Sequence, residues 1–205
     1  MSEGKNLVVC GQTRSGKSYF VKQLIESEQR LLIYLPKRDE KDYPGVMFDG
    51  LAGERDLMLR WWKYTDQRCG RWRLVYRPRD IFDVEEFDKI CTLAYKAGAC
   101  TVVAEDIMTY ATERNIGQGF KTLLTAGNSR GCSVIAMTQR PYRIPVEVTS
   151  QAREVYLFRS FHEQDMAFIR NTWGQDAAAK VDTLKQYEHV TWNDSGQVDK
   201  GKASA

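Results

Sequence analysis

The stretch Leu7-Val8-Val9-Cys10-Gly11-Gln12-Thr13-Arg14-Ser15-Gly16-Lys17-Ser18 contains the pattern that decides the fold. Four apolar residues come first, then the pattern Gly-x-x-x-x-Gly-Lys-Ser, and then a segment with apolar residues at helical spacing. This order of buried strand, tight loop and helix is the setting of a phosphate-binding P-loop. The sequence therefore predicts that a nucleoside triphosphate binds at the end of the first strand.

Each residue type in this loop has a chemical reason. Gly11 and Gly16 let the backbone curl until its N–H groups point inward at phosphate oxygens. We expect Lys17 to reach the β- and γ-phosphates of ATP and the Ser18 hydroxyl to bind Mg²⁺, while the helix dipole attracts the same anion. The predicted nucleotide-binding residues are Gly11, Gln12, Thr13, Arg14, Ser15, Gly16, Lys17, Ser18 and Tyr19.

Length and composition are those of an ordinary soluble protein. A chain of 205 residues suits a single domain, for which we predict a small C-terminal appendage over about residues 160–205. The net charge of +3 indicates no class of partner by itself. Five cysteines without a Cys-x-x-Cys pair favour reduced thiols in a cytosolic setting, and two histidines are too few for a zinc site. No apolar run approaches the ~20 residues of a membrane span.

Apolar runs alternate with segments of helical spacing along most of the chain. This alternation predicts an α/β fold with a mostly parallel sheet and helices on both faces. The exception is the end of the chain, where Asn193-Asp194-Ser195-Gly196 separates two short strand patterns at 187–192 and 197–200. A turn of this composition predicts a C-terminal hairpin.

An acidic pair follows the apolar run Thr101-Val102-Val103-Ala104. Ligands of parallel sheets bind at the carboxyl ends of the strands, so Glu105 and Asp106 stand where a Walker B motif holds Mg²⁺ and activates the attacking water. The usual order of the two acids is Asp then Glu, and here it is reversed. By position Glu105 is the metal ligand and Asp106 the general base, and the opposite assignment stays open.

A second polar strand end follows at Thr138-Gln139, after the apolar run from Val134 to Met137. The amide of Gln139 can donate to the γ-phosphate and accept from the attacking water at the same time. We therefore predict that Gln139 is the sensor residue of a nucleotide hydrolase.

The segment Ala136-Met137-Thr138-Gln139-Arg140-Pro141 resembles the sensor motif of the FtsK/HerA superfamily of DNA-pumping ATPases. The P-loop opening (residues 14–19) and the tail (residues 177–187) are similar to the viral branch of this superfamily, the genome-packaging ATPases of tailless icosahedral viruses. The resemblance covers nearly the whole chain. It implies a RecA-like P-loop domain, ATP and Mg²⁺ as cofactors, and hydrolysis at the subunit interfaces of a five- or six-membered ring. It also implies that duplex DNA passes through the pore, that capsid vertex proteins are partners, and that the protein works in the host cytoplasm and at the virion's packaging vertex.

Such rings place an arginine of one subunit in the active site of the next. Relatives carry it about three residues ahead of the glycine that matches Gly131, where this chain has Asn128. The trans-acting arginine is therefore open among four candidates, and we place Arg130 and Arg140 first: Arg130, Arg140, Arg143 and Arg153.

A motor must grip DNA phosphates without reading bases, which calls for cations on loops near the hydrolytic residues. The loop from Tyr110 to Gly119 follows the acidic pair directly, and it supplies Arg114, with Lys121 just beyond. Three other interpretations compete with a packaging motor. One is another DNA-translocating ATPase of the FtsK/HerA type. The second is a small-molecule P-loop kinase, although such kinases usually carry an arginine-rich lid, and the third is a non-catalytic, nucleotide-gated scaffold.

Overall fold

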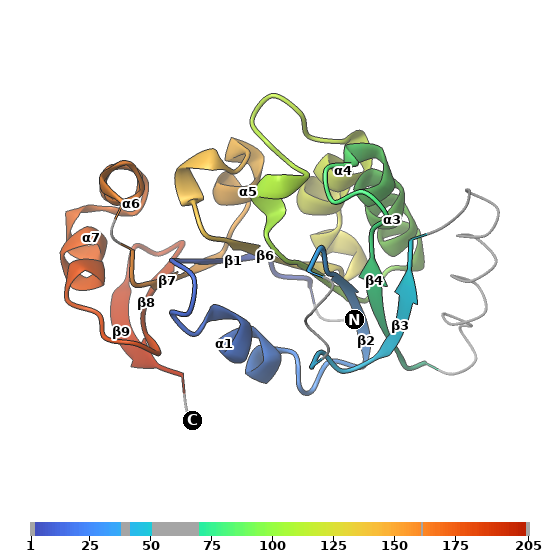
Figure 1. Cartoon of the computed structure of the whole chain (residues 1–205), viewed down its shortest axis with the longest axis horizontal. Helices are drawn as coiled ribbons and strands as arrows, with labels where there is room; N and C mark the ends of the chain where they lie inside the picture. The colour runs from blue at the N-terminus through green and yellow to red at the C-terminus, as the bar shows by residue number, and fades with distance from the viewer. Residues whose placement is uncertain (1–2, 38–41, 51–69, 161, 204–205) are drawn as a thin grey trace.

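A nine-stranded sheet runs through the computed structural model, which describes residues 3–37, 42–50, 70–160 and 162–203 (Figure 1). The strand order is β3-β4-β2-β5-β6-β1-β7-β8-β9. The strands are β1 (Leu7–Cys10), β2 (Arg30–Tyr34), β3 (Val46–Asp49), β4 (Trp72–Arg77), β5 (Thr101–Ala104), β6 (Ser133–Thr138), β7 (Glu154–Phe158), β8 (Glu188–Asn193) and β9 (Val198–Lys202).

All neighbouring strands from β3 to β7 pair in parallel, and β8 and β9 add an antiparallel hairpin. The predicted mostly parallel sheet and C-terminal hairpin are confirmed. The order β5-β6-β1 puts the predicted Walker B strand, sensor strand and P-loop strand next to one another. Because these strands are parallel, their carboxyl ends lie at one edge of the sheet.

Helices cover both faces of the sheet, as predicted (Figure 1). The helix α1 lies on one face, and α3, α4 and α5 lie on the other. The side chain of Asp83 caps α3 by accepting hydrogen bonds from the backbone N–H groups of Glu85 and Glu86. The helices are α1 (Lys17–Leu24), α3 (Val84–Ala97), α4 (Gln118–Ala126), α5 (Val146–Ser150), α6 (Glu163–Trp173) and α7 (Gln175–Asp182).

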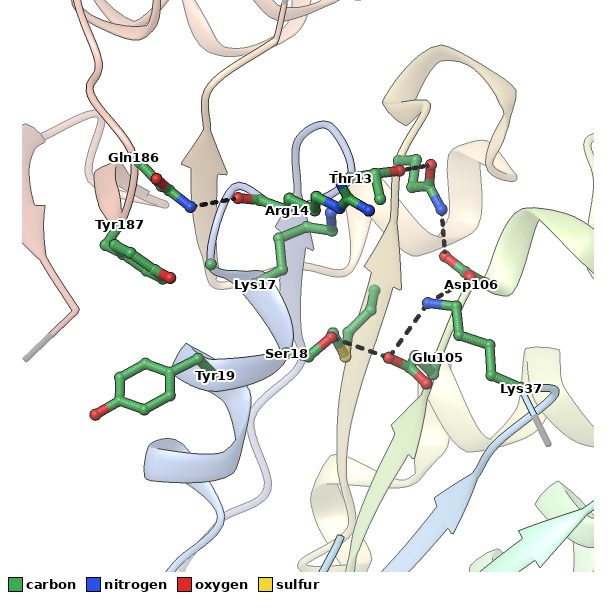
Figure 2. A pocket seen from close by; sticks show the side chains of 13 residues that line it. Thr13, Arg14, Lys17, Ser18, Tyr19, Lys37, Glu105, Asp106, Gln186 and Tyr187 are labelled. Atoms are coloured by element: carbon green, nitrogen blue, oxygen red, sulfur yellow. Dashed lines mark hydrogen bonds and ion pairs between the residues drawn. The ribbon is translucent and has the colours of Figure 1, made fainter. Parts of the chain in front are cut away.

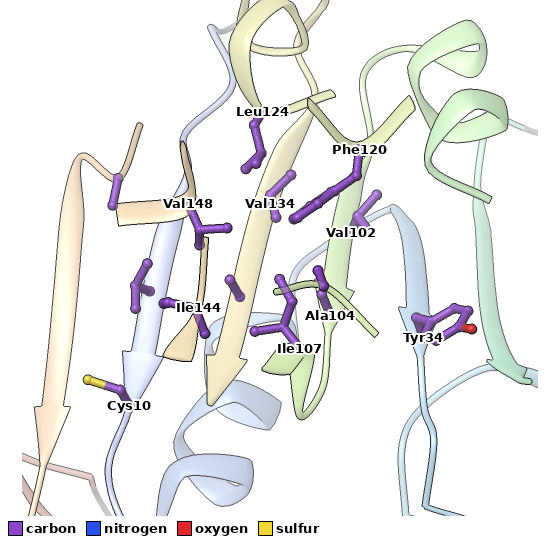
Figure 3. Close-up of a cluster of buried hydrophobic side chains, with 14 of the residues drawn as sticks. Cys10, Tyr34, Val102, Ala104, Ile107, Phe120, Leu124, Val134, Ile144 and Val148 are labelled. Atoms are coloured by element: carbon purple, nitrogen blue, oxygen red, sulfur yellow. The ribbon is translucent and has the colours of Figure 1, made fainter. Parts of the chain in front are cut away.

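Side chains of the central strands alternate between two buried clusters. Val102 and Val134 contribute to the cluster that includes Phe120 and Leu124 of α4 (Figure 3). Their neighbours Val103 and Ile135 belong to the opposite cluster, with Phe20 and Val21 of α1. Both faces of these strands are therefore buried, which explains why they read as continuous apolar runs.

The C-terminal segment extends the same sheet instead of standing apart from it. The strand β7 pairs with β1 on the side away from β6, and β8 and β9 follow at that edge. The chain after β7 is thereby placed beside the P-loop. The division into a domain and an appendage near residue 160 stays a prediction. In the part of the chain that the structure describes, no helix has the length and apolar character needed to cross a membrane.

Candidate active site

The P-loop links β1 to α1 through backbone angles that favour glycine. Gly11 has φ = 145° and Gly16 has φ = 110°, both in the region that side chains disfavour. Space is also short, because a Cβ at Gly11 would lie 2.6 Å from the Cβ of Phe158, and one at Gly16 would lie 2.8 Å from Cδ1 of Tyr187. The two glycines therefore permit the turn and let residues from the C-terminal third of the chain approach it.

Lys17 lies inside this loop. Its Nζ donates hydrogen bonds to the backbone oxygens of Gly11 and Gln12, both at 2.7 Å, and the residue is 8% exposed. Burial lowers the pKa of Lys17 to about 8, although nearby Asp106 raises it. The loop therefore encloses a desolvated ammonium group, which is suited to attract a phosphate.

The predicted metal ligands meet across the neighbouring strands. The hydroxyl of Ser18 donates a hydrogen bond to Oε1 of Glu105 at 3.1 Å, and Glu105 is only 1% exposed (Figure 2). Tyr43 Oη lies 3.4 Å from the same oxygen. A hydroxyl and a carboxylate are hard oxygen ligands of the kind that Mg²⁺ prefers, and Mg²⁺ usually takes its remaining ligands from phosphates and water. The residues present therefore fit a Mg²⁺ site.

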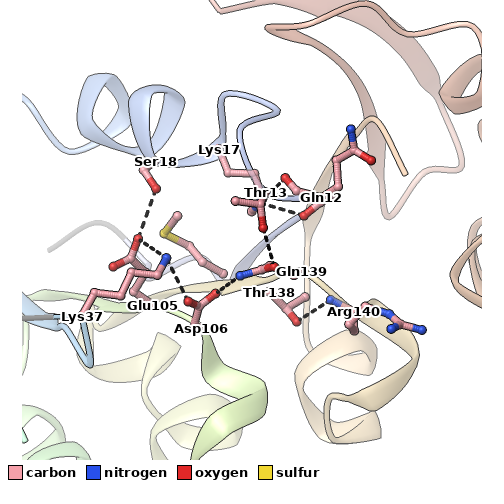
Figure 4. Close-up of polar contacts among 12 residues, drawn as sticks. Gln12, Thr13, Lys17, Ser18, Lys37, Glu105, Asp106, Thr138, Gln139 and Arg140 are labelled. Carbon is pink, nitrogen blue, oxygen red and sulfur yellow. Dashed lines mark hydrogen bonds and ion pairs between the residues drawn. The ribbon is translucent and has the colours of Figure 1, made fainter. Parts of the chain in front are cut away.

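A line of hydrogen bonds joins the ends of the three central strands (Figure 4). Thr13 of the P-loop donates to Oε1 of Gln139 at 2.7 Å, and Nε2 of Gln139 donates to Oδ1 of Asp106 at 3.3 Å. Asp106 has left-handed backbone angles (φ = 48°) at the start of the 3-10 turn η2 (Ile107–Thr109), so its side chain turns toward this line and not along the strand. The predicted sensor and general base are thus direct neighbours.

These residues surround a cavity of about 420 Å³ (Figure 2). The predicted residues that line it are Thr13, Arg14, Gly16, Lys17, Ser18, Tyr19, Glu105, Asp106 and Gln139. The residues Lys37, Gln186 and Tyr187 also line it, and they were not predicted. The sequence carried little signal for them, because Lys37 opens a charge-dense stretch of sequence and the other two lie some 170 residues beyond the P-loop.

Tyr187 and Tyr19 form the aromatic side of the site. Their ring centroids lie 6.3 Å apart, and the ring planes make an angle of 71°. The two residues are 43% and 40% exposed, and they line an apolar cavity of about 340 Å³. The backbone N–H of Tyr187 donates to the backbone oxygen of Ser15 at 3.1 Å, and Nε2 of Gln186 donates to that of Arg14 at 3.3 Å. Exposed rings next to a phosphate cradle offer a surface on which a nucleobase can stack.

Two of the four candidate arginines lie at the amino ends of the strands, on the side of the sheet away from the P-loop. Arg130 ends the 3-10 turn η3 (Asn128–Arg130), two residues before β6 begins, and donates hydrogen bonds to the backbone oxygens of Tyr95 and Lys96. Arg153 directly precedes β7, with a nitrogen 2.8 Å from a carboxylate oxygen of Glu3. Both stand at the amino ends of strands whose carboxyl ends flank the P-loop, so neither faces the site of its own chain.

The other two arginines follow the sensor strand. Nε of Arg140 lies 2.7 Å from Oδ2 of Asp165, which is fully buried, and its guanidinium stacks 4.9 Å from the ring of Tyr142. Burial raises the pKa of the Asp165 carboxyl, which Arg140 opposes. Arg143 is exposed and donates to the hydroxyl of Tyr142 at 2.8 Å. Arg140 thus has a partner within its own chain, whereas Arg143 points outward.

The proposed DNA-contacting cations lie on the outer surface. Arg114 is exposed in a tight turn closed by backbone hydrogen bonds between Thr112 and Asn115, on the loop between η2 and α4 that projects on the side of α3 and α4 (Figure 1). Lys121 is on α4, and its Nζ lies 2.8 Å from Oε1 of Glu147. Arg114 therefore presents its charge to solvent, and Lys121 shares its charge with a carboxylate.

The comparisons with known proteins find the fold but no relative by sequence. No protein-family model and no curated protein matches this chain. The genome packaging NTPase B204 of Sulfolobus turreted icosahedral virus 2, solved with sulfate, superposes with a TM-score of 0.77 at 19% identity over 98% of both chains. B204 of Sulfolobus turreted icosahedral virus, a DNA-packaging ATPase, gives 0.77 at 21% identity and the same coverage. VirB4 of Thermoanaerobacter pseudethanolicus gives 0.66 at 11% identity, over 98% of this chain and 89% of that one. The chain has the P-loop NTPase fold of these proteins.

The Arg140–Asp165 pair generates a prediction about stability. Arg140→Ala leaves a buried carboxylate without its cation, and we expect the free energy of unfolding to fall by about 3 kcal/mol. Arg143→Ala, a matched change at an exposed arginine on the same turn, should stay within about 0.5 kcal/mol of the parent chain. Urea denaturation of the three proteins measures both values. Equal stability of the two variants would show that the ion pair is not a structural one.

Proposed function

We propose that this protein is an ATPase that translocates viral double-stranded DNA into a preformed capsid. The observation that supports hydrolysis is the hydrogen-bonded line of Thr13, Gln139 and Asp106 beside the Ser18–Glu105 contact. DNA packaging is supported by the fold, which superposes over 98% of the chain on the genome packaging NTPase and the DNA-packaging ATPase of two viruses.

The residues divide the chemistry among them. The P-loop amides and Lys17 bind the phosphates, and Ser18 and Glu105 are the residues that would hold Mg²⁺. When bound, the ion neutralises charge that develops on the phosphate oxygens. Asp106 accepts the proton of the attacking water, and the amide of Gln139 orients that water and contacts the departing phosphate. The contact between Ser18 and Glu105 supports this assignment of the two acids over the reverse one.

A hydrolase is favoured over a kinase by the position of Gln139. Its amide is held between the P-loop and Asp106, 2.7 Å and 3.3 Å from its partners, where a hydrogen-bonding group can position water. A kinase instead needs a second substrate hydroxyl at this position. Asp106 lines the cavity, which supports a working base and speaks against a non-catalytic scaffold.

The motor works as a homo-oligomeric ring of five or six subunits in this proposal, with capsid vertex proteins as partners at the packaging vertex. The arginine that completes each site comes from the next subunit. Arg130 suits this role because its exposed side chain stands at the amino ends of the strands, on the side opposite its own P-loop. It has no carboxylate partner among the ion pairs of the described residues, although its guanidinium donates to the backbone oxygens of Tyr95 and Lys96. Arg143 is the exposed alternative near the sensor. Arg140 is less suited because it already pairs with Asp165.

The experiment that tests the proposal compares phosphate release with and without duplex DNA. The purified chain should hydrolyse ATP, and added duplex should raise the rate several-fold whatever its sequence. Lys17→Ala serves as the matched negative control, because it removes the cation inside the P-loop. Hydrolysis that ignores DNA, in a protein that stays monomeric by light scattering with DNA and nucleotide, would reject the motor. Phosphorylation of a small hydroxyl substrate would establish the kinase.

A second prediction concerns the contact between Arg114 and the phosphates of DNA. Arg114→Ala should weaken duplex binding about equally for any sequence and reduce the salt slope of the affinity by about one, because one phosphate contact is lost. The DNA-stimulated part of the ATPase rate should fall much more than the basal part. Fluorescence anisotropy at several salt concentrations measures the slope. Arg170→Ala is the control, an exposed arginine on α6, outside the loop. If both variants lose duplex affinity equally, the loop that carries Arg114 does not contact DNA.

A further inference from the structure

Lys37 is a cation in the active site that the proposed mechanism does not use. It follows Pro36 after the end of β2, and β2 lies directly beside β5, with Tyr34 opposite Ala104. The backbone N–H of Glu105 donates to the oxygen of Tyr34 at 3.1 Å, beyond the last paired residues. The segments that leave these two strands therefore start side by side, which brings Lys37 to the acidic pair.

The ammonium group of Lys37 lies between the two acids (Figures 2 and 4). Its Nζ is 2.8 Å from Oδ2 of Asp106 and 3.6 Å from Oε1 of Glu105. That oxygen of Glu105 is the one that accepts the hydrogen bond from Ser18, so Lys37 contacts the predicted metal-binding carboxylate. The other oxygen of Asp106 accepts from Gln139. Both oxygens of the predicted general base are thus engaged, one of them by a full positive charge.

Electrostatics explains why a cation is needed there without nucleotide. The side chains of Glu105 and Asp106 are only 1% and 14% exposed, and two adjacent, poorly hydrated carboxylates repel each other. Lys37 compensates this charge, yet its own side chain is 44% exposed. Such a long, flexible side chain, with nearly half its surface in water, can leave the acids at a small cost in free energy once another cation compensates their charge.

We propose that Lys37 is an exchangeable cation that occupies the acidic pair in the nucleotide-free chain and is released when Mg²⁺ and nucleotide enter. While it is bound, its ammonium group occupies the Asp106 oxygen that the attacking water would otherwise contact. Its release frees that carboxylate, so the site becomes competent only when it is loaded. This inference rests on the proposed nucleotide site, and it adds a control on that site.

The direct test follows the reactivity of the amine in the wild-type chain. Acetylation under limiting reagent, quantified by mass spectrometry, should modify Lys37 slowly without nucleotide, because the ion pair protects the amine. With Mg²⁺ and a non-hydrolysable ATP analogue, the labelling rate of Lys37 should rise about five- to tenfold, as expected for the loss of an ion pair of this exposure. Lys180 is the matched control, since it is 37% exposed and its Nζ lies 2.8 Å from Asp176 on α7. Its rate should not change.

Every other result of the labelling experiment rejects either the exchange of Lys37 or the nucleotide site itself. Calorimetry of the same samples reports whether the analogue binds. No binding rejects the proposed nucleotide site and the exchange with it. Binding with unchanged Lys37 labelling rejects the exchange alone, and binding with slower labelling would mean that Lys37 clamps the phosphates.

A variant gives an independent readout. Lys37→Met removes the charge and keeps an unbranched side chain of similar length. It should raise the affinity of the nucleotide-free chain for Mn²⁺, measured by electron paramagnetic resonance, about fivefold. Lys17→Met removes a charge that does not contact the acids and should raise it less. Basal hydrolysis without DNA should rise in Lys37→Met and stay unchanged in Lys180→Met. Equal Mn²⁺ affinities for the two site variants, or a fall in basal hydrolysis, would contradict the proposal.

Discussion

The parallel alignment of β5, β6 and β1 is the constraint on which the rest of the site depends. It brings Asp106, Gln139 and Thr13 to one edge of the sheet, although they lie far apart in the chain, and their side chains then form one hydrogen-bonded line. The alignment itself is fixed by burial on both faces, because each of these strands contributes apolar side chains to both cores. The geometry of the polar site is therefore a consequence of the apolar sheet beneath it.

Charge compensation shapes the same edge. Two carboxylates stand side by side with little access to water, and an ammonium from the neighbouring strand end lies against them. A second ammonium, that of Lys17, lies within the P-loop against backbone oxygens. Lys17 lies where the negatively charged phosphates of a nucleotide would bind. Lys37 lies at the acids, where a positively charged metal ion would bind. A site arranged in this way is expected to exchange its internal partners for those of the bound nucleotide.

The parts of the site that could be predicted from the sequence are those in which a strand and its following loop carry the chemistry. The P-loop, Glu105, Asp106 and Gln139 each follow an apolar run directly, so their place at a strand end could be predicted, and the alternation of elements predicted the parallel sheet. The alternation of apolar runs does not fix the order of the strands. Tyr187 reaches the P-loop only because β7 lies beside β1, and Lys37 reaches the acids only because β2 lies beside β5.

The same limit applies to the arginines. Arg140 was predicted as a catalytic candidate from its place after the sensor, but its partner Asp165 lies on a helix 25 residues further along the chain. Only the packing of α6 against the sensor loop reveals that pair. A single chain also lacks the neighbour whose site such an arginine would complete, so the trans-acting residue stays a prediction.

Glu105 and Asp106 have different tasks in the proposed mechanism, and one paired measurement separates them. The affinity for a Mg²⁺–nucleotide complex and the single-turnover hydrolysis rate are measured for Glu105→Gln and Asp106→Asn. We expect Glu105→Gln to lose the dependence of nucleotide binding on Mg²⁺, because the carboxylate next to Ser18 is gone. Asp106→Asn should bind normally and hydrolyse at least about 100-fold more slowly. The reverse pattern, in which Asp106→Asn loses the metal and Glu105→Gln traps bound ATP, would show that the two acids have exchanged roles.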